Sequence, residues 1–265
     1  MNIYKKIILL LILPLLAYLF SSVMTLIGVK EEQKMLLEVD KNLRIIHELS
    51  LLFLNLQKER GLTYSYLNGD TASKNKVITQ HTYTNQSLEK FESSLKKEEK
   101  SFSYQITLKD LEEIREKVKE NSDAFFVFIE YSNKIDQLLY LYFLMTNEKT
   151  TRGTGKLLSS IQMLEEAKEH AARFRGLSSG VIARNQNILP EETQVLFSTY
   201  SGMTGLLNFN GLLLPPKTKE KLENLPGFGE KKAENIIKEV KNTLKTKPEK
   251  LLAAFGIPLI GRTLS

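Results

Sequence analysis

Residues 49–67, with the sequence LSLLFLNLQKERGLTYSYL, decide the fold of the central part of the chain. Apolar side chains recur there at steps of three and four positions, which is the period of one face of an α-helix. The stripe runs through Leu49, Phe53, Leu56, Arg60, Thr63 and Leu67. A second stripe has the same period and runs through Leu111, Ile114, Val118, Ala124 or Phe125, and Phe128. Because no segment alternates like a strand between hairpin turns, we predict an all-α fold, an antiparallel helical bundle.

We assign residues 31–212 to this bundle. Helix breaks are expected at the Asn68-Gly69-Asp70 turn and in the segments 100–103, 150–155 and 185–190. Pro190, followed by two glutamates, is a favourable helix start, because proline suits the first helical position and acidic groups suit an N-terminus.

An uncharged apolar run at residues 7–29 precedes the bundle. A helix of this length can cross the hydrocarbon core of a membrane. Lys5 and Lys6 precede the run, and the charges directly after it cancel. By the positive-inside rule we predict that residues 1–30 form a single-pass anchor in the cell (inner) membrane, with a cytoplasmic N-terminus and an extracytoplasmic body. The alternative is a cleaved signal peptide, but the apolar run is longer than such peptides usually have.

The composition excludes several kinds of chemistry. The 265 residues include no cysteine, so there is no disulfide, cysteine-ligated zinc or thiol nucleophile. Only three histidines occur, at unrelated spacings, which argues against a metal site. We expect no catalytic residue, cofactor or metal, and therefore no enzyme. The net charge is +6, and the segment 215–265 holds eleven basic and six acidic residues, a balance that suggests a phosphate or an anionic lipid as its partner.

Arg60 stands at a position of the first stripe where a core residue is expected. A buried guanidinium must be paired or solvated, and Glu59, Glu165 or Glu169 could pair it. The local sequence also recurs, since Arg60-Gly61-Leu62-Thr63 corresponds to Arg175-Gly176-Leu177-Ser178. Two such faces, each with an arginine and a hydroxyl, could instead form a pocket for a small planar anion such as nitrate or a carboxylate.

Residues 56–63, LQKERGLT, resemble the LQ-x-ERG-x-S/T signature of the nitrate- and nitrite-sensing domain found in bacterial histidine kinases, chemoreceptors and related receptors. That family has a second arginine motif, which residues 168–176, KEHAARFRG, resemble. The resemblance covers about residues 45–205. It implies an all-helical extracytoplasmic sensor in signal transduction that binds nitrate or nitrite.

The resemblance also implies which side chains hold the anion. They are Arg60 and either Arg175 or Arg173, with Thr63 and Ser178 as candidate hydrogen-bond donors. Binding would act by a population shift between two helix packings that reaches the membrane helix. No output module is recognisable, and a homodimer is left open.

The tail, residues 213–265, predicts a different module. Residues 222–242, LENLPGFGEKKAENIIKEVKN, read as two helices around a Pro-Gly-Phe-Gly turn, a helix-hairpin-helix. Gly227 and Gly229 would let backbone amides face a phosphate, and Lys231 and Lys232 add positive charge. With residues 251–262, this tail resembles the helix-hairpin-helix region of bacterial NAD-dependent DNA ligase, which implies weak, nonspecific DNA contact.

A ligase activity is not expected from this tail, because the Lys-x-Asp-Gly adenylation motif and the zinc-binding cysteines of that family are missing from the sequence. The alternative function is therefore a catalytically inactive DNA-binding fragment. It would belong to a chimeric or truncated reading frame joined near residues 211–216.

Overall fold

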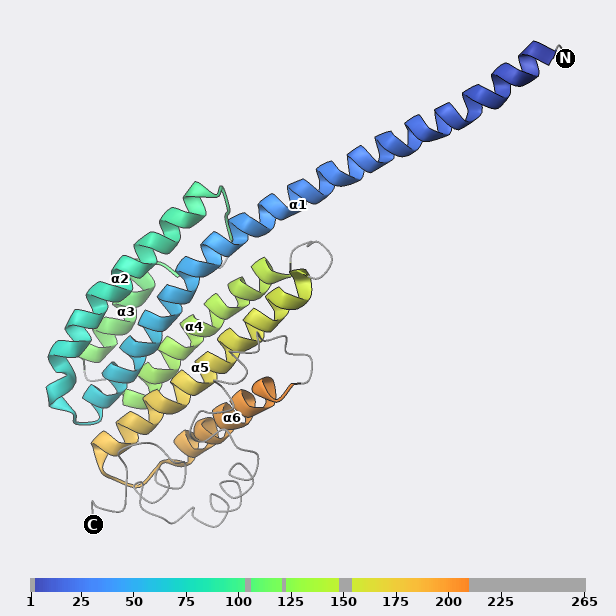
Figure 1. Cartoon of the computed structure of the whole chain (residues 1–265). Helices are drawn as coiled ribbons and strands as arrows, with labels where there is room; N and C mark the ends of the chain where they lie inside the picture. Colours follow the sequence, from blue (N-terminus) through green and yellow to red (C-terminus); the bar gives the residue numbers. More distant parts are fainter. Residues whose placement is uncertain (1–2, 103–105, 121–122, 148–153, 210–265) are drawn as a thin grey trace.

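The computed structural model describes residues 3–102, 106–120, 123–147 and 154–209. Within these ranges the chain forms six α-helices and one short 3-10 helix, and no strand (Figure 1). The all-α prediction is confirmed. The helices are α1 (Ile3–Leu67), α2 (Lys74–Lys97), α3 (Leu108–Lys119), α4 (Ala124–Thr146), α5 (Thr154–Arg184) and α6 (Pro190–Leu207), with the 3-10 helix η1 at Thr71–Ser73.

The expected anchor and the first helix of the bundle are one continuous helix, α1, which contains Pro14. Its N-terminal part projects beyond the other helices (Figure 1), and its apolar side chains there, such as Leu15, Phe20 and Leu26, are exposed. Among the described helices, α1 is the one long and apolar enough to cross a membrane by length and composition. The helix passes through residue 30, where we expected the anchor to end, without a break.

Successive helices run in alternating directions, and α1 lies at the centre, where it packs against α2, α4 and α5 (Figure 1). Because of this alternation, α1 and α5 run parallel. Contacts at several levels share an offset of 115 or 116 residues, as in the hydrogen bonds Ser50–Glu165 and Arg184–Asn68 and the facing glycines Gly61 and Gly176. The two copies of the Arg-Gly-Leu-Thr/Ser sequence therefore lie at the same level of the bundle.

Three of the four predicted breaks coincide with helix ends. The helix α1 ends before the Asn68-Gly69-Asp70 turn, where Gly69 has a φ of 108° that glycine adopts without strain. The helix α2 ends at Lys97, just before the expected break at 100–103, and α5 ends at Arg184. Most of the fourth break lies at 148–153, outside the described residues, and α5 begins directly after it.

Pro190 occupies the first turn of α6, as predicted. The Glu192 carboxylate accepts a hydrogen bond from the backbone N–H of Leu189 at 2.8 Å, which satisfies a donor that the helix start would leave free. Glu192 also pairs with Arg184 of α5 at 2.6 Å and thereby joins the two helices.

The main core lies between α1, α2, α3 and α4. Both predicted stripes contribute to it, through Leu49, Phe53, Leu56, Leu111 and Ile114, which are all buried. The second stripe does not lie on one helix as predicted, because α3 ends at Lys119 and α4 begins at Ala124, where the Asp123 side chain caps it. A smaller cluster around Tyr64, Phe128, Leu177 and Leu196 fills the space between α1, α4, α5 and α6. Arg60 lies near this second cluster, because its guanidinium carbon is 5.0 Å from the centre of the Phe128 ring.

Candidate functional site

Arg60 is fully buried in the middle of the bundle and pairs with Glu169 of α5. Its Nη1 donates to Glu169 Oε1 at 2.5 Å, and its Nη2 donates to Glu169 Oε2 at 3.2 Å. This two-pronged pair is the arrangement that a planar guanidinium forms with a planar oxyanion. Glu169 was one of the three carboxylates that the sequence offered as a partner for Arg60.

Two further side chains donate to the same carboxylate. Arg173 Nε, from the next turn of α5, donates to Glu169 Oε1 at 3.0 Å, and Gln57 Nε2, from α1, donates to Glu169 Oε2 at 3.0 Å. Arg173 is also paired with Asp136 of α4, at 2.7 Å. The Glu169 carboxylate is therefore held by four N–H groups from two helices and is almost fully buried.

The helix α4 closes the other side of the Arg60 guanidinium. Arg60 Nη1 donates to Ser132 Oγ at 3.0 Å, and the Phe128 ring lies against the cation. Burial lowers the pKa of Arg60, whereas the adjacent Glu169 carboxylate opposes this shift. Arginine remains charged despite such a shift, because its ordinary pKa is so high. Arg60 is therefore a buried cation whose charge is balanced by Glu169, with Ser132 and Phe128 on its other side.

A close approach of two glycines brings α1 and α5 together at this level. An added Cβ on Gly176 would lie 3.3 Å from the Cα of Gly61, and one on Gly61 would lie 3.4 Å from the Cα of Gly176. An added Cβ at either position would therefore be in tight contact with the backbone of the other helix. The two glycines of the repeated sequence thus face each other across the α1–α5 contact.

Arg175 is exposed, although it holds the same place in its sequence repeat as Arg60. The parallel packing explains this difference. Gly61 and Gly176 face each other, and the residue before each glycine lies about 100° away around its helix. Because the two helices run parallel, this rotation has the same sense in both, so Arg60 and Arg175 lie on opposite sides of the plane that contains the two helix axes. Arg60 turns toward α4 and is covered by it, whereas Arg175 turns away from α4. Arg173 and Glu169 lie on the covered side.

The two predicted hydroxyl donors are buried. Thr63 has no exposed surface and Ser178 is 2% exposed. Ser178 Oγ has no hydrogen-bond partner among the described residues, and the same holds for Arg60 Nε. The structure therefore brings Arg60 together with Arg173, leaves Arg175 at the surface, and places Thr63 and Ser178 in the interior of the bundle.

A second buried ion pair, which the sequence reasoning missed, lies on the side of α1 that faces α3. Arg115 of α3 donates to the Glu59 carboxylate at 2.9 and 3.0 Å, and the Tyr131 hydroxyl donates to Glu59 Oε1 at 2.7 Å. The signal was available, because Arg115 stands four residues after Leu111 and three before Val118, a spacing that places it on the same helix face as these apolar residues. Glu59 therefore pairs with Arg115, and not with Arg60 as one of the alternatives from the sequence would have it.

A cavity of about 450 Å³ opens beside the Arg60–Glu169 pair. Side chains of α4 and α5 line it, and they are Asp136, Leu139, Tyr140, Phe143, Gln162, Glu166, Glu169, His170 and Arg173. Glu169 and Arg173 belong both to this cavity and to the buried cluster. A small solute that enters the cavity therefore reaches Glu169 and Arg173 first, and Arg60 lies directly behind them.

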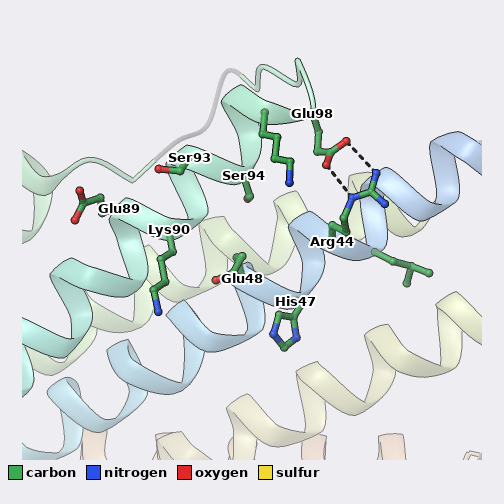
Figure 2. A pocket seen from close by; sticks show the side chains of 10 residues that line it. Arg44, His47, Glu48, Glu89, Lys90, Ser93, Ser94 and Glu98 are labelled. Atoms are coloured by element: carbon green, nitrogen blue, oxygen red, sulfur yellow. Dashed lines mark hydrogen bonds and ion pairs between the residues drawn. The ribbon is translucent and has the colours of Figure 1, made fainter.

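A larger cavity of about 650 Å³ lies between α1 and α2 (Figure 2). Its lining carries both signs of charge, with Arg44 and Lys90 beside Glu48 and Glu89, and Arg44 is already paired with Glu98 at 2.8 Å. None of the predicted site residues lines it.

Two predictions remain to be placed. In the described part of the chain, no group of three or more His, Asp or Glu side chains could hold a metal ion. Gly227, Gly229, Lys231 and Lys232 lie in 210–265, outside the described residues, so the helix-hairpin-helix and its DNA contact stay predictions.

The fold and the site together define an all-α bundle with a buried cluster of two arginines and one glutamate. The chain matches the family described as nitrate and nitrite sensing over residues 52–240, more than half of its length, and it belongs to this family. The match begins seven residues after the start of the resemblance that we noted in the sequence. It continues past residue 212, where we placed the end of the bundle domain.

Among solved structures, the chain is similar to the NasR transcription antiterminator, with a TM-score of 0.67 and 18% sequence identity. The likeness covers 89% of this chain and 68% of that chain, and at this identity it concerns the fold alone. No curated protein matches the chain. Neither match concerns a DNA ligase, so the proposed origin of the tail receives no support from them.

Proposed function

We propose that this chain is a membrane-anchored, extracytoplasmic sensor that binds nitrate, nitrite or a similar small oxyanion in the cluster between α1, α4 and α5. Arg60 and Arg173 bind the anion in this proposal, and Thr63 and Ser178 remain candidate donors. Membership of the nitrate- and nitrite-sensing family supports the ligand class. The protein is a receptor in this proposal and performs no chemistry on its ligand.

One observation carries the proposal, namely the coordination of the Glu169 carboxylate. A carboxylate is planar, carries one delocalised negative charge and accepts hydrogen bonds in its own plane, and nitrate and nitrite share these properties. The four donors from Arg60, Arg173 and Gln57 are therefore already arranged for such a group. The nearby cavity provides the access that a small anion needs.

The signal in this proposal is a change in the packing of α5 against α1. The anion contacts both helices, so it stabilises whichever packing holds the two arginines at the better distance. Since α1 continues into the apolar N-terminal segment, a shift of α1 within the bundle also moves that segment. The size of the response is limited by the difference in affinity between the two packings.

The test is a calorimetric titration of sodium nitrate into the purified full-length chain in detergent micelles, with sodium chloride as the reference salt. We expect saturable binding that Arg60→Ala abolishes. Arg173→Ala removes one charge-assisted donor and should weaken binding about 10- to 100-fold. Arg175→Ala is the matched control and should leave the affinity unchanged.

The outcomes separate the alternatives. Equal losses from the substitutions at Arg173 and Arg175 would contradict the assignment of Arg173. The absence of saturable heat for nitrate and nitrite, from a chain shown to be helical by circular dichroism, would leave Arg60 as the structural half of a buried ion pair.

A further inference from the structure

The Glu169 carboxylate occupies the place where an external anion would bind. Its two oxygens accept four hydrogen bonds, two from Arg60 and one each from Arg173 and Gln57. A ligand anion in this cluster would need these same donors, because they belong to its two cations and to Gln57. Apart from Glu169, the anionic group of the cluster is Asp136, which pairs with Arg173.

We propose that Glu169 is an internal competitor of the ligand: its carboxylate fills the anion site of the unliganded protein, and nitrate binds by displacing it. The inference rests on the proposed function and adds to it the residue that sets the affinity. Glu169 then acts as a switch as well, because its carboxylate leaves the anion site only when the ligand binds there.

Charge balance requires an exchange rather than an addition. Arg60 and Arg173 carry two positive charges, and Glu169 and Asp136 carry two negative charges, so the filled cluster is neutral. A second anion next to a buried carboxylate would add an uncompensated charge and like-charge repulsion in a poorly solvated place. If nitrate replaces the Glu169 carboxylate, the cluster keeps its balance.

The neighbouring cavity gives the displaced carboxylate a place to go. Glu169 lines this cavity of about 450 Å³ as well as the buried cluster. Rotation about its own side-chain bonds therefore carries the carboxylate toward the cavity and water, while α5 stays helical. The displaced Glu169 also loses its bonds to Arg60 and Gln57 of α1, so the exchange replaces a direct α1–α5 link by one through the ligand.

An internal competitor lowers the apparent affinity by the fraction of molecules in which the site is open. The receptor then responds only when the anion is abundant. Removal of the negative charge from Glu169 should therefore tighten nitrate binding, whereas loss of a merely structural residue leaves affinity unchanged or weakens it.

The experiment is the same nitrate titration on the full-length chain, comparing the wild-type chain with Glu169→Gln. We expect the variant to bind nitrate at least about tenfold more tightly. The control is Glu166→Gln, which removes a charge from the lining of the same cavity but not from the Arg60 cluster, and it should change the nitrate affinity far less than Glu169→Gln does. A variant affinity equal to or weaker than that of the wild-type chain overturns the inference, even if the wild-type chain binds nitrate.

A second readout covers the case in which Glu169→Gln folds poorly. Without nitrate its Tm should fall below that of the wild-type chain, because Arg60 loses its counter-charge, and saturating nitrate should raise its Tm more than it raises the wild-type value. Glu169→Asp, which keeps the charge but shortens the side chain, should also bind more tightly than the wild-type chain. If neither the wild-type chain nor any of these variants binds nitrate, the proposed function fails together with the inference.

Discussion

Two adjacent residues of α1, Glu59 and Arg60, carry opposite charges and are both fully buried. They lie about 100° apart around the helix, so Glu59 pairs with Arg115 of α3, whereas Arg60 pairs with Glu169 of α5. Burial by itself would raise the pKa of Glu59, but the hydrogen bonds and charge of Arg115 outweigh it and lower that pKa. The two pairs fix the rotation of α1 within the bundle from both sides.

The substitution Glu59→Gln should destabilise the protein strongly, because it leaves the Arg115 cation buried without its main partner. We expect the free energy of unfolding to fall by about 3 kcal/mol. Urea denaturation in detergent, followed by circular dichroism, measures it. The control is Glu112→Gln, which removes a half-exposed carboxylate that contacts the same arginine at 2.8 Å and should cost less than about 1 kcal/mol. Equal losses in the two variants would contradict the importance of the buried pair.

The sequence predicts part of the site and leaves a specific part undetermined. Arg60 is recognisable because it interrupts an apolar stripe, and Glu169 is among its three candidate partners. The choice between Arg173 and Arg175 depends on the side of α5 that faces α4. That side follows from the parallel packing of α1 and α5, which helix periodicity alone does not contain.

At the scale of the elements, small residues control how closely helices pack. Gly180 of α5 faces the Tyr64 ring, and an added Cβ would lie 2.0 Å from the ring atom Cδ1. Gly205 of α6, in contrast, has nothing within 4 Å of such a Cβ. Two glycines in helices of one bundle therefore have opposite roles, one required by packing and the other only a weak helix former.

Gly180→Ala should lower the free energy of unfolding by about 1–3 kcal/mol, because the methyl group forces the Tyr64 ring or the helix to move. Gly205→Ala should instead raise it by up to about 1 kcal/mol, since alanine favours the helix. Thermal denaturation of both variants measures the two effects. The same sign of change in both would contradict this view of the α1–α5 contact.

The start of α3 predicts a pH dependence. Thr107 and Asp110 form a reciprocal cap, and the Asp110 carboxylate also accepts from Lys134 of α4 at 2.7 Å. Burial opposes the shift, but the hydrogen bonds from Lys134 and Thr107 lower the pKa of Asp110 to about 2. A lowered carboxylate pKa stabilises the folded state above the ordinary value of 3.8, and this stabilisation disappears as the pH falls toward 2.

Asp110→Asn should therefore be less stable than the wild-type chain at pH 7 and equally stable near pH 2. Urea denaturation midpoints between pH 7 and pH 2 measure the convergence. The substitution Glu113→Gln is the control on the same helix. Glu113 is largely exposed and its contact with Lys109 is long, at 3.9 Å, so its loss should change the stability little at any pH. A constant difference between Asp110→Asn and the wild-type chain at all pH values would contradict the prediction.

At the scale of the whole molecule, the helix ends were largely predictable and the continuity of α1 was not. Turn residues such as Asn68-Gly69-Asp70 and Pro190 mark helix ends by local backbone preference, so the sequence contains them. The change from apolar to charged residues at Lys30, Glu31 and Glu32 marks where a membrane could end. It does not end the helix, because lysine and glutamate are good helix formers.

The orientation of the chain in the membrane can be tested by cysteine labelling, and the chain itself gives no background labelling because its sequence has no cysteine. Lys109, which has a side chain 86% exposed, and Lys5 would each be replaced by cysteine. A membrane-impermeant maleimide should label Lys109→Cys in intact spheroplasts and Lys5→Cys only after lysis, as the positive-inside rule predicts. The reverse pattern would place the bundle in the cytoplasm.

The continuity of α1 gives the protein the geometry of a lever. About 46 Å of unbroken helix separate Arg60 from Val29, at a rise of about 1.5 Å per residue. If the part of α1 near Arg60 tilts by about 5°, the segment near Val29 is displaced sideways by about 4 Å over that length. If the proposed displacement of Glu169 tilts α1 in this way, the far end of the helix moves by about the separation of two packed atoms.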